Sequence, residues 1–400
     1  MAKRTGGFIG QDGINAPDQA TGVSASGGDT QATVSFTSPS DVGGADVTGY
    51  RVQSNDGIGA SGSASPITVT GLTNGTSYTF NVWAINPFGW SSPSDASGGV
   101  TPTLAVAAFM GGYTTGDSLT NTIDYINFAS TGNATDFGDL ISVMRNGSKG
   151  SVSSSTRGVV GGGATGSDAE YNIIQYITFA SVGNATDFGD LTQIREQLGG
   201  CSSSTRGVFA GGADNGYNYN IVDYITIAST GNATDFGDLL DITRTLGGAG
   251  SSTRGVFAGG EAPTSEDINV IQYITIASTG NSTDFGDMSG TGRHAACCSN
   301  STRMLIGAID GAVSDNTIEY ITIASTGNST DFGDLTISKT TRAAASSSTL
   351  GVWAGGQGAY DNTIDYVTIS TTGNALNWGD LTSPRGSVSG GASSVHGGLS

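Results

Sequence analysis

The apolar residues of this 400-residue chain fall in short runs, such as Ile225-Thr226-Ile227-Ala228, that are bounded by Gly, Asn, Ser and Thr. Short β-rich runs between turn-forming residues are typical of a protein built from many short strands. No stretch carries the apolar stripe of a helix longer than a turn or two. The pattern therefore predicts an all-β chain.

One unit recurs six times between residues 104 and 394. Its clearest marker is Asp-Phe-Gly-Asp, whose aromatic position returns every 46 to 51 residues, and a tyrosine keeps the same spacing. A period near fifty with strand-like content predicts a propeller or an array of sheets. The aromatic positions are Phe137, Phe188, Phe236, Phe285, Phe332 and Trp378, and the tyrosines are Tyr125, Tyr176, Tyr224, Tyr273, Tyr320 and Tyr366.

The third copy shows how a unit is built. It has an apolar run ending in Gly211-Gly212, a variable loop, and further runs at residues 221–229 and 233–239. Gly231-Asn232 between the last two runs predicts a tight hairpin. The stretch after Arg244 supplies a fourth strand. Sequons such as Asn232-Ala233-Thr234 recur at this hairpin, and we attribute them to turn chemistry rather than to glycosylation.

The repeats resemble the kelch motif, in which a strand ends in Gly-Gly, the fourth strand carries a Trp, and an Arg follows. Phe replaces the Trp in five copies, Trp378 keeps it, and the fifth copy has Gly307-Ala308 instead of a double glycine. The resemblance implies a six-bladed kelch-like β-propeller over residues 103–400. The double glycines are Gly111-Gly112, Gly162-Gly163, Gly211-Gly212, Gly259-Gly260 and Gly355-Gly356.

The two ends of the repeat region are out of phase. The first unit begins at its Gly-Gly strand, whereas the last continues past Arg385 into residues 387–391, which match an innermost strand. We therefore expect the C-terminal segment to pair beside residues 104–110 and to close the ring. Closure would remove unpaired sheet edges.

Residues 17–102 form a separate segment with the pattern of a β-sandwich. Tyr78, Phe80, Val82 and Ala84 alternate with mostly polar residues, as in a half-buried strand, and Leu72 before Tyr78 predicts a tyrosine corner. The segment resembles a fibronectin type III domain, although Phe36 stands where that family usually has a buried tryptophan. The resemblance carried by residues 72–93 implies the fold, and such domains often act as spacers.

Arginines follow the aromatic marker in all six units, at Arg145, Arg195, Arg244, Arg293, Arg342 and Arg385. Their regular placement predicts a structural role, in which partly buried arginine–carboxylate pairs fix neighbouring sheets. The expected partners are the carboxylates of the repeated motif: Asp136, Asp139, Asp187, Asp190, Asp235 and Asp238. The alternative is an arginine ring that captures anionic sugars.

The acidic motif is expected to place its aromatic ring between sheets and its carboxylates at a turn. Calcium binding at such turns is one alternative. No other metal or cofactor is predicted, because the chain has only two histidines and its three cysteines lack the spacing of a metal-binding motif. Nothing matches a nucleophile triad, so we expect no enzyme activity. A formal net charge of −19 argues against nucleic acid as a partner, and no apolar stretch is long enough for membrane insertion.

The loops after Gly-Gly vary most and carry the candidate ligand-binding tyrosines Tyr113, Tyr171, Tyr217, Tyr219 and Tyr360. Variable loops on a rigid frame are where recognition usually occurs, and aromatic faces beside amides and carboxylates suit sugar rings. Solvated loops without a ligand are the equally weighted alternative.

Residues 1–16 are Gly-rich and lack the apolar core of a secretory signal. The opening stretch from Arg4 to Gly13 is similar to leaders of marine cyanophage virion proteins. We therefore expect a bacteriophage virion appendage (tail, neck or capsid). Its leader would anchor to other virion proteins through Arg4, Phe8 and Ile9, and its propeller would bind host-surface glycan or decorate the particle, in multiple copies. A kelch-type carbohydrate enzyme and a protein-interaction scaffold are the alternatives.

Overall fold

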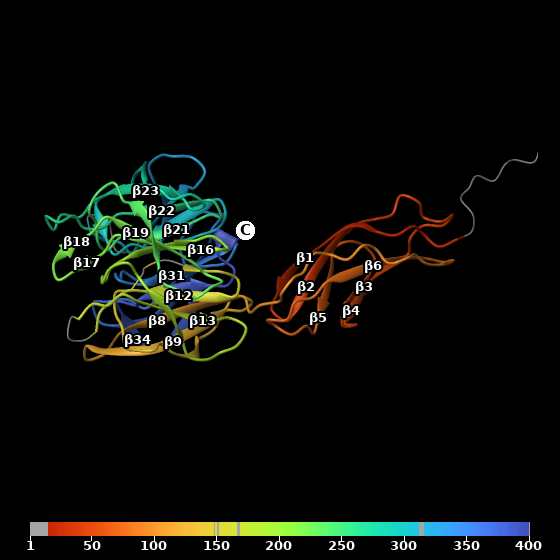
Figure 1. Cartoon of the computed structure of the whole chain (residues 1–400), viewed down its shortest axis with the longest axis horizontal. Coiled ribbons are helices and arrows are strands. Elements are labelled where there is room, and N and C mark those ends of the chain that lie inside the picture. Colours follow the sequence, from red (N-terminus) through yellow and green to blue (C-terminus); the bar gives the residue numbers. More distant parts are fainter. Residues whose placement is uncertain (1–14, 148, 150–151, 166–168, 312–315, 400) are drawn as a thin grey trace, which may run out of the picture. The chain divides into compact units, whose positions relative to one another are not determined.

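A computed structural model gives the fold, and it describes residues 15–147, 149, 152–165, 169–311 and 316–399. The chain divides into two compact units, Met1–Leu104 and Ala105–Ser400. Strands make up nearly all regular structure in the described residues, and a single 3-10 turn, η1 (Gly397–Leu399), follows the last strand (Figure 1). The prediction of an all-β protein is confirmed.

The first unit is a sandwich of two antiparallel sheets. Their facing residues form one apolar core, because alternate residues along each inner strand are buried, as in β6. One sheet has the order β1 (Thr21–Gly28), β2 (Gln31–Thr37), β5 (Ile67–Thr70), and the other has the order β4 (Gly59–Gly62), β3 (Gly49–Ser54), β6 (Phe80–Asn86), β7 (Gly89–Trp90).

A tyrosine corner fixes the connection from β5 to β6. The Thr73 N–H donates to the Tyr78 hydroxyl at 3.0 Å, and Leu72 beside it is buried, as the sequence predicted. Phe36 fills the tryptophan position and lies 4.7 Å from the Tyr50 ring, measured between ring centroids. A smaller ring therefore completes this core with the help of a neighbouring tyrosine.

The second unit contains the six repeats, each with four antiparallel strands. Repeats 1 and 6 join through a short pairing of β34 with β8. Repeat 1 has β8 (Val106–Thr114), β9 (Ser118–Asn127) and β10 (Thr135–Asp139), and its fourth strand is β35 (Gly390–Ser393). Repeat 2 has β11 (Val152–Ser153), β12 (Arg157–Gly161), β13 (Ile173–Thr178) and β14 (Thr186–Asp190), and repeat 3 has β15 (Gly199–Ser202), β16 (Arg206–Ala210), β19 (Ile221–Thr226) and β20 (Thr234–Asp238).

The remaining repeats follow the same order. Repeat 4 has β21 (Gly247–Gly250), β22 (Arg254–Ala258), β23 (Val270–Thr275) and β24 (Thr283–Asp287). Repeat 5 has β26 (Ala296–Ser299), β27 (Arg303–Gly307), β29 (Thr317–Thr322) and β30 (Thr330–Asp334), and repeat 6 has β31 (Ala343–Ser346), β32 (Leu350–Ala354), β33 (Asp361–Thr368) and β34 (Leu376–Gly386). Two hairpins in the loops add β17 (Ala213–Asp214) with β18 (Tyr217–Asn218), and β25 (Gly292–Arg293) with β28 (Asp310–Gly311).

The C-terminal strand completes the first repeat. Gly390 pairs with Met110 and Ser393 with Ala107, so the predicted pairing beside residues 104–110 is confirmed. The first strands of successive repeats lie next to each other from β11 to β31, and β35 lies next to both β31 and β11. Small residues allow this close approach: a side chain on Gly391 would begin 2.0 Å from the Ala344 carbonyl oxygen.

One backbone junction recurs between consecutive repeats. At the first, the N–H of Gly183 donates to Phe137 O, the Ala185 N–H donates to Asp139 O, and the Asn184 side chain accepts from the Asp139 N–H at 3.0 Å. The same set joins repeat 6 to repeat 1, where Asn133 accepts from the Asp380 N–H at 3.1 Å. The sequon asparagines thus hold the hairpin of one repeat to the outer strand of another.

The Asp-Phe-Gly-Asp motif lies in that outer strand and not at a turn, which corrects the sequence-based expectation. The pairing register shifts at Phe137, and Gly138 has a φ of +142°. A Cβ on Gly138 would lie 2.6 Å from the Gly183 carbonyl, so only glycine admits the neighbouring hairpin. The bulge turns the aromatic ring inward, and Phe285 of repeat 4 packs in one cluster with Ile306 of repeat 5.

A second group of arginines ties repeats 2 to 5 to their successors. The Arg206 guanidinium lies 4.3 Å from the centroid of the Tyr224 ring and donates to Ile276 O in repeat 4 at 2.7 Å. Arg157, Arg254 and Arg303 make the corresponding contacts. The recurring tyrosine therefore serves as a cation–π platform.

The six arginines after the aromatic marker fall into two classes. Three are fully buried, and they pair with the carboxylate one residue before the repeat tyrosine: Arg195 with Asp223 at 2.6 Å, Arg342 with Asp365 at 2.5 Å, and Arg385 with Asp124 at 2.6 Å. These partners differ from the motif carboxylates expected from the sequence. Arg145, Arg244 and Arg293 lie instead among the loops.

Repeat 4 shows how the buried site is filled without an ion pair. Gln272 takes the place of Asp223, and its side-chain oxygen accepts from the Leu240 N–H at 2.9 Å and from the Ser282 hydroxyl at 2.7 Å. In repeat 3 the Thr192 N–H and hydroxyl donate to Asp223. Glutamine therefore keeps the backbone contact and carries no charge.

Replacing Arg195 with methionine should destabilise the second unit by about 3–5 kcal/mol, because the Asp223 carboxylate is left buried without its cation. The double variant Arg195→Met/Asp223→Gln should recover most of that loss, since glutamine can still accept from the Thr192 N–H. Urea unfolding of the three proteins measures the difference. A double variant no more stable than the single one would contradict this account of the pair.

Candidate functional site

The loops after Gly-Gly and the connections between repeats meet at a depression of about 570 Å³, here called the polar depression. Its lining comes from repeats 1, 2, 3, 5 and 6 or from the connections that lead into them. Two of the five candidate tyrosines lie together there. The lining residues are Tyr113, Asp117, Arg145, Asn146, Gln197, His294, Gln357, Tyr360 and Ser387.

The other candidate tyrosines lie elsewhere. The Tyr171 hydroxyl donates to Val143 O at 3.3 Å, and burial raises its pKa, while Tyr217 is 73% exposed at the tip of the β17–β18 hairpin. The Tyr219 N–H donates to Gly212 O, and Tyr219 O accepts from the Thr243 N–H. The anchoring residues Arg4, Phe8 and Ile9 lie outside the described residues.

One residue in each connection between repeats has a left-handed backbone, with φ between 47° and 64°. Each leads into the innermost strand of the next repeat. We call these residues the left-handed set: Asn146, Gln197, Thr245, His294, Thr341 and Ser387. None is glycine, and four belong to residue types that rarely adopt this conformation. Strained residues of this kind cluster at binding and catalytic sites.

Backbone hydrogen bonds link the left-handed set. Gln197 N–H donates to Asn146 O at 2.6 Å, Thr245 N–H donates to Gln197 O at 2.9 Å, and His294 N–H donates to Thr245 O at 2.7 Å. On the other side, the hydroxyls of Thr341 and Ser387 both donate to the Gln357 side-chain oxygen at 3.3 Å. Because the backbone fixes the positions, the side chains are free to differ.

The two tyrosines of the polar depression are held by charged neighbours. The Tyr360 hydroxyl donates to Asp117, and this hydrogen bond, more than burial, raises the pKa of Tyr360 to about 12. The Arg145 guanidinium lies 5.5 Å from the centroid of the Tyr113 ring. The Tyr360 phenol is therefore neutral at physiological pH, and each of the two rings has a charged side chain beside it.

An ion cluster lies beside the polar depression on the loops of repeats 4 and 5. Glu261 is buried and accepts from Arg244 at 2.5 Å and from Arg293 at 3.0 Å, and Arg293 also reaches Asp310 at 3.1 Å. Burial opposes ionisation of Glu261, but these two arginines still hold its pKa below the usual value. Arg244 and Arg293 are thus paired within the protein.

Lys149 is buried and His294 is half-buried, and the surroundings shift the pKa of both side chains. Lys149 is 2% exposed, and burial lowers its pKa to about 8. Burial first, and then the charges of Lys149, Arg293 and Arg244, lower the pKa of His294 well below its usual value. At neutral pH the lysine is therefore mostly charged and the histidine is neutral.

His396 lies beyond the last strand, against the first strands of repeats 2 and 3. Its Nε2 donates to Ser153 O at 2.9 Å, and its Nδ1 accepts from the Gly398 N–H at 3.0 Å. Burial lowers the pKa of His396 to about 4, although the Ser153 carbonyl opposes the shift. Both ring nitrogens are satisfied only in the neutral form.

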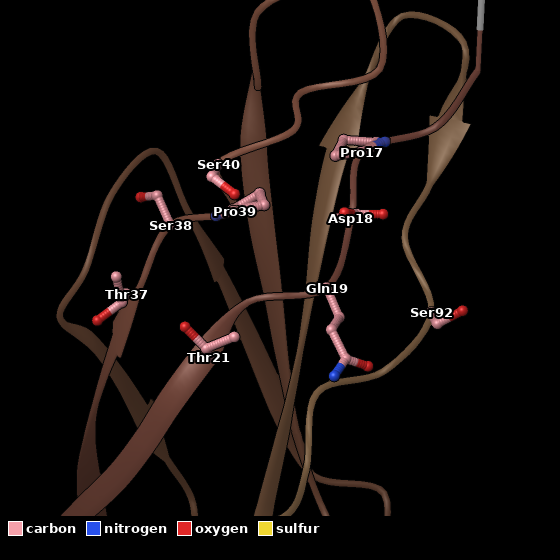
Figure 2. A pocket seen from close by; sticks show the side chains of 9 residues that line it. All are labelled: Pro17, Asp18, Gln19, Thr21, Thr37, Ser38, Pro39, Ser40 and Ser92. Carbon is pink, nitrogen blue, oxygen red and sulfur yellow. The ribbon is translucent and has the colours of Figure 1, made fainter. Parts of the chain in front are cut away.

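A second depression of about 550 Å³ lies in the first unit. Residues 17–21 and 37–40 face each other across it, with Ser92 beside them (Figure 2). Its side chains are hydroxyls, prolines, one amide and the Asp18 carboxylate, and it has no aromatic ring. It offers fewer means of holding a ligand than the polar depression does.

The three cysteines of the described residues are buried and free. No group of three or more His, Cys, Asp or Glu side chains is arranged there to hold a metal ion. Burial raises the pKa of the three thiols, Cys201, Cys297 and Cys298, so they remain protonated. In the part of the chain that the structure describes, no helix has the length and apolar character of a membrane span.

Comparisons with known proteins concern the first unit. Residues 16–99 match the family model of the fibronectin type III domain. A crystal structure of domains A168-A170 from titin matches at 30% identity with a TM-score of 0.21, over 22% of this chain and 32% of that one. The match thus spans about a third of the titin chain. No curated protein matches. Residues 16–99 are therefore a fibronectin type III domain.

The free energy of unfolding should fall as the pH drops from about 6.5 to about 4, because over this range His396 becomes protonated in the unfolded chain but stays neutral in the folded protein. The loss approaches about 3 kcal/mol below pH 4. The His396→Gln variant lacks this titration, so the difference in unfolding free energy between the two proteins should change across the same interval. A difference independent of pH would contradict the buried neutral histidine.

Proposed function

We propose that residues 105–400 form a six-bladed kelch-like β-propeller whose polar depression binds carbohydrate. The junction that joins each repeat to the next also joins repeat 6 to repeat 1, and β35 completes the sheet of repeat 1. Both contacts connect the last repeat or the C-terminal strand to the first repeat, as in a propeller whose sheets form a closed ring. In such a ring the polar depression lies at the end where the six connections converge.

The composition of the polar depression favours a sugar over an apolar ligand. Two oriented tyrosine rings can pack against the faces of a pyranose, while amides and a carboxylate can bind its hydroxyls. The left-handed set carries this proposal, since four of its six members line the polar depression and most of the set are amides or hydroxyls.

The complete chain would be a virion appendage, with residues 1–16 as its anchor to other virion proteins and the fibronectin type III domain as a spacer. The resemblance of the leader to phage proteins and the spacer role common to such domains support this part of the proposal. Sugar binding by each copy would be weak and strengthened by several copies on one particle.

The full-length chain applied to an array of neutral and acidic oligosaccharides tests the proposal. Tyr113→Ala and Gln357→Ala should each weaken binding of the best ligand by about tenfold or more, because about 1.4 kcal/mol corresponds to tenfold. Tyr217→Ala, which removes an exposed tyrosine outside the depression, is the matched control.

Unchanged binding by both depression variants would exclude this site. Release of shorter products from a bound oligosaccharide would instead indicate a carbohydrate-active enzyme.

A further inference from the structure

Lys149 is a buried ammonium group without a partner. Its Nζ is inaccessible to solvent and has no hydrogen-bond partner among the described residues. Burial lowers the pKa of Lys149, and in the described part of the chain no carboxylate lies within hydrogen-bond distance of its Nζ. An unpaired buried cation is costly, so a protein retains one where an incoming group supplies the missing charge.

The backbone places Lys149 next to the left-handed set. Lys149 N–H donates to Leu198 O at 2.7 Å, and Gly200 N–H donates to Lys149 O at 2.8 Å, so it lies on the innermost edge of repeat 2, beside the strand that follows Gln197. Its charge acts on His294, which belongs to the connection into repeat 5. The charge of Lys149 therefore reaches a residue that lines the polar depression.

Two further buried atoms near this charge lack partners in the described structure: Gln197 Oε1 and His294 Nδ1. Both residues line the polar depression. A neutral histidine can donate from Nδ1, and a side-chain amide can turn to present its N–H₂ group. Two unsatisfied hydrogen-bonding groups therefore line the depression, and the unpaired ammonium of Lys149 lies within electrostatic range of one of them, His294.

We propose that the floor of the polar depression binds the carboxylate of an acidic sugar, such as a uronic acid, through Lys149, His294 and Gln197. This inference rests on the proposed carbohydrate function. One carboxylate matches one unpaired ammonium, while Asp117 and Gln357 above it suit the neutral hydroxyls of the same ring. The nearby arginines Arg244 and Arg293 are already paired, so they do not call for a second negative group.

Calorimetric titration of the full chain with glucuronate, glucose and sodium sulfate tests the assignment. Glucuronate should bind at least about tenfold more tightly than glucose, and Lys149→Met should abolish that preference. Arg51→Met, which removes one positive charge from the first unit, should leave it unchanged. Without ligand, Lys149→Met should raise the melting temperature, because it removes an unpaired buried charge.

Other outcomes separate this inference from the proposed function. Equal binding of glucose and glucuronate would overturn the carboxylate site and leave sugar binding intact. Sulfate binding as strong as glucuronate binding, lost in Lys149→Met, would show a site for small anions and overturn the sugar assignment. Absence of binding to any sugar of the array would contradict both the carboxylate site and the proposed function. A lower melting temperature for Lys149→Met and Lys149→Gln alike would show a structural lysine and overturn the inference.

Discussion

The second unit depends on one backbone contact, in which the hairpin of each repeat is held to the outer strand of the repeat before it. The outer strand can receive the hairpin only because its bulge carries a glycine, as at Gly138, where any side chain would meet the Gly183 carbonyl. The asparagine of the hairpin then satisfies a strand N–H that would otherwise lack a partner. Identical geometry at every junction explains why the motif barely varies.

This uniform frame places the variable residues. Each connection between repeats carries one left-handed residue, whatever its side chain is, and four of these residues line the polar depression. Gly, Asn, Phe and Tyr at fixed positions therefore form the frame, while Asn146, Gln197 and His294 differ from one connection to the next and line the polar depression.

Much of the fold could be predicted from the sequence because its signals are local or periodic. The spacing of Phe and Tyr identified the repeats, the phase of the ends identified the pairing of β35, and Leu72 with Tyr78 identified the corner. The carboxylate partners of the arginines could not be found this way. Asp223 differs from Asp235 and Asp238 only by facing inward, which depends on the register of strands that are distant in sequence.

Only part of the candidate site could be predicted from the sequence, for a similar reason. Variable loops indicated Tyr113 and Tyr360, but nothing in their sequence separates them from Tyr217, which points to solvent. Most of the left-handed set could not be recognised from the sequence, because glutamine, threonine and serine carry no preference for that backbone conformation. Lys149 was visible as one of only three lysines, yet its burial arises from packing between repeats.

The uneven distribution of the buried ion pairs bears on how such a repetitive chain assembles. Asp124, Asp223 and Asp365 each have a matching arginine. Gln175 and Gln272 occupy the same position in repeats 2 and 4, and in repeat 5 the position is taken by Glu319, which accepts from the Ser289 and Ser329 hydroxyls instead. If the sheets associated one place out of order, some aspartates would face no cation and some guanidinium groups no carboxylate. Arrangements of these near-identical modules that separate a buried aspartate from its arginine are thereby disfavoured.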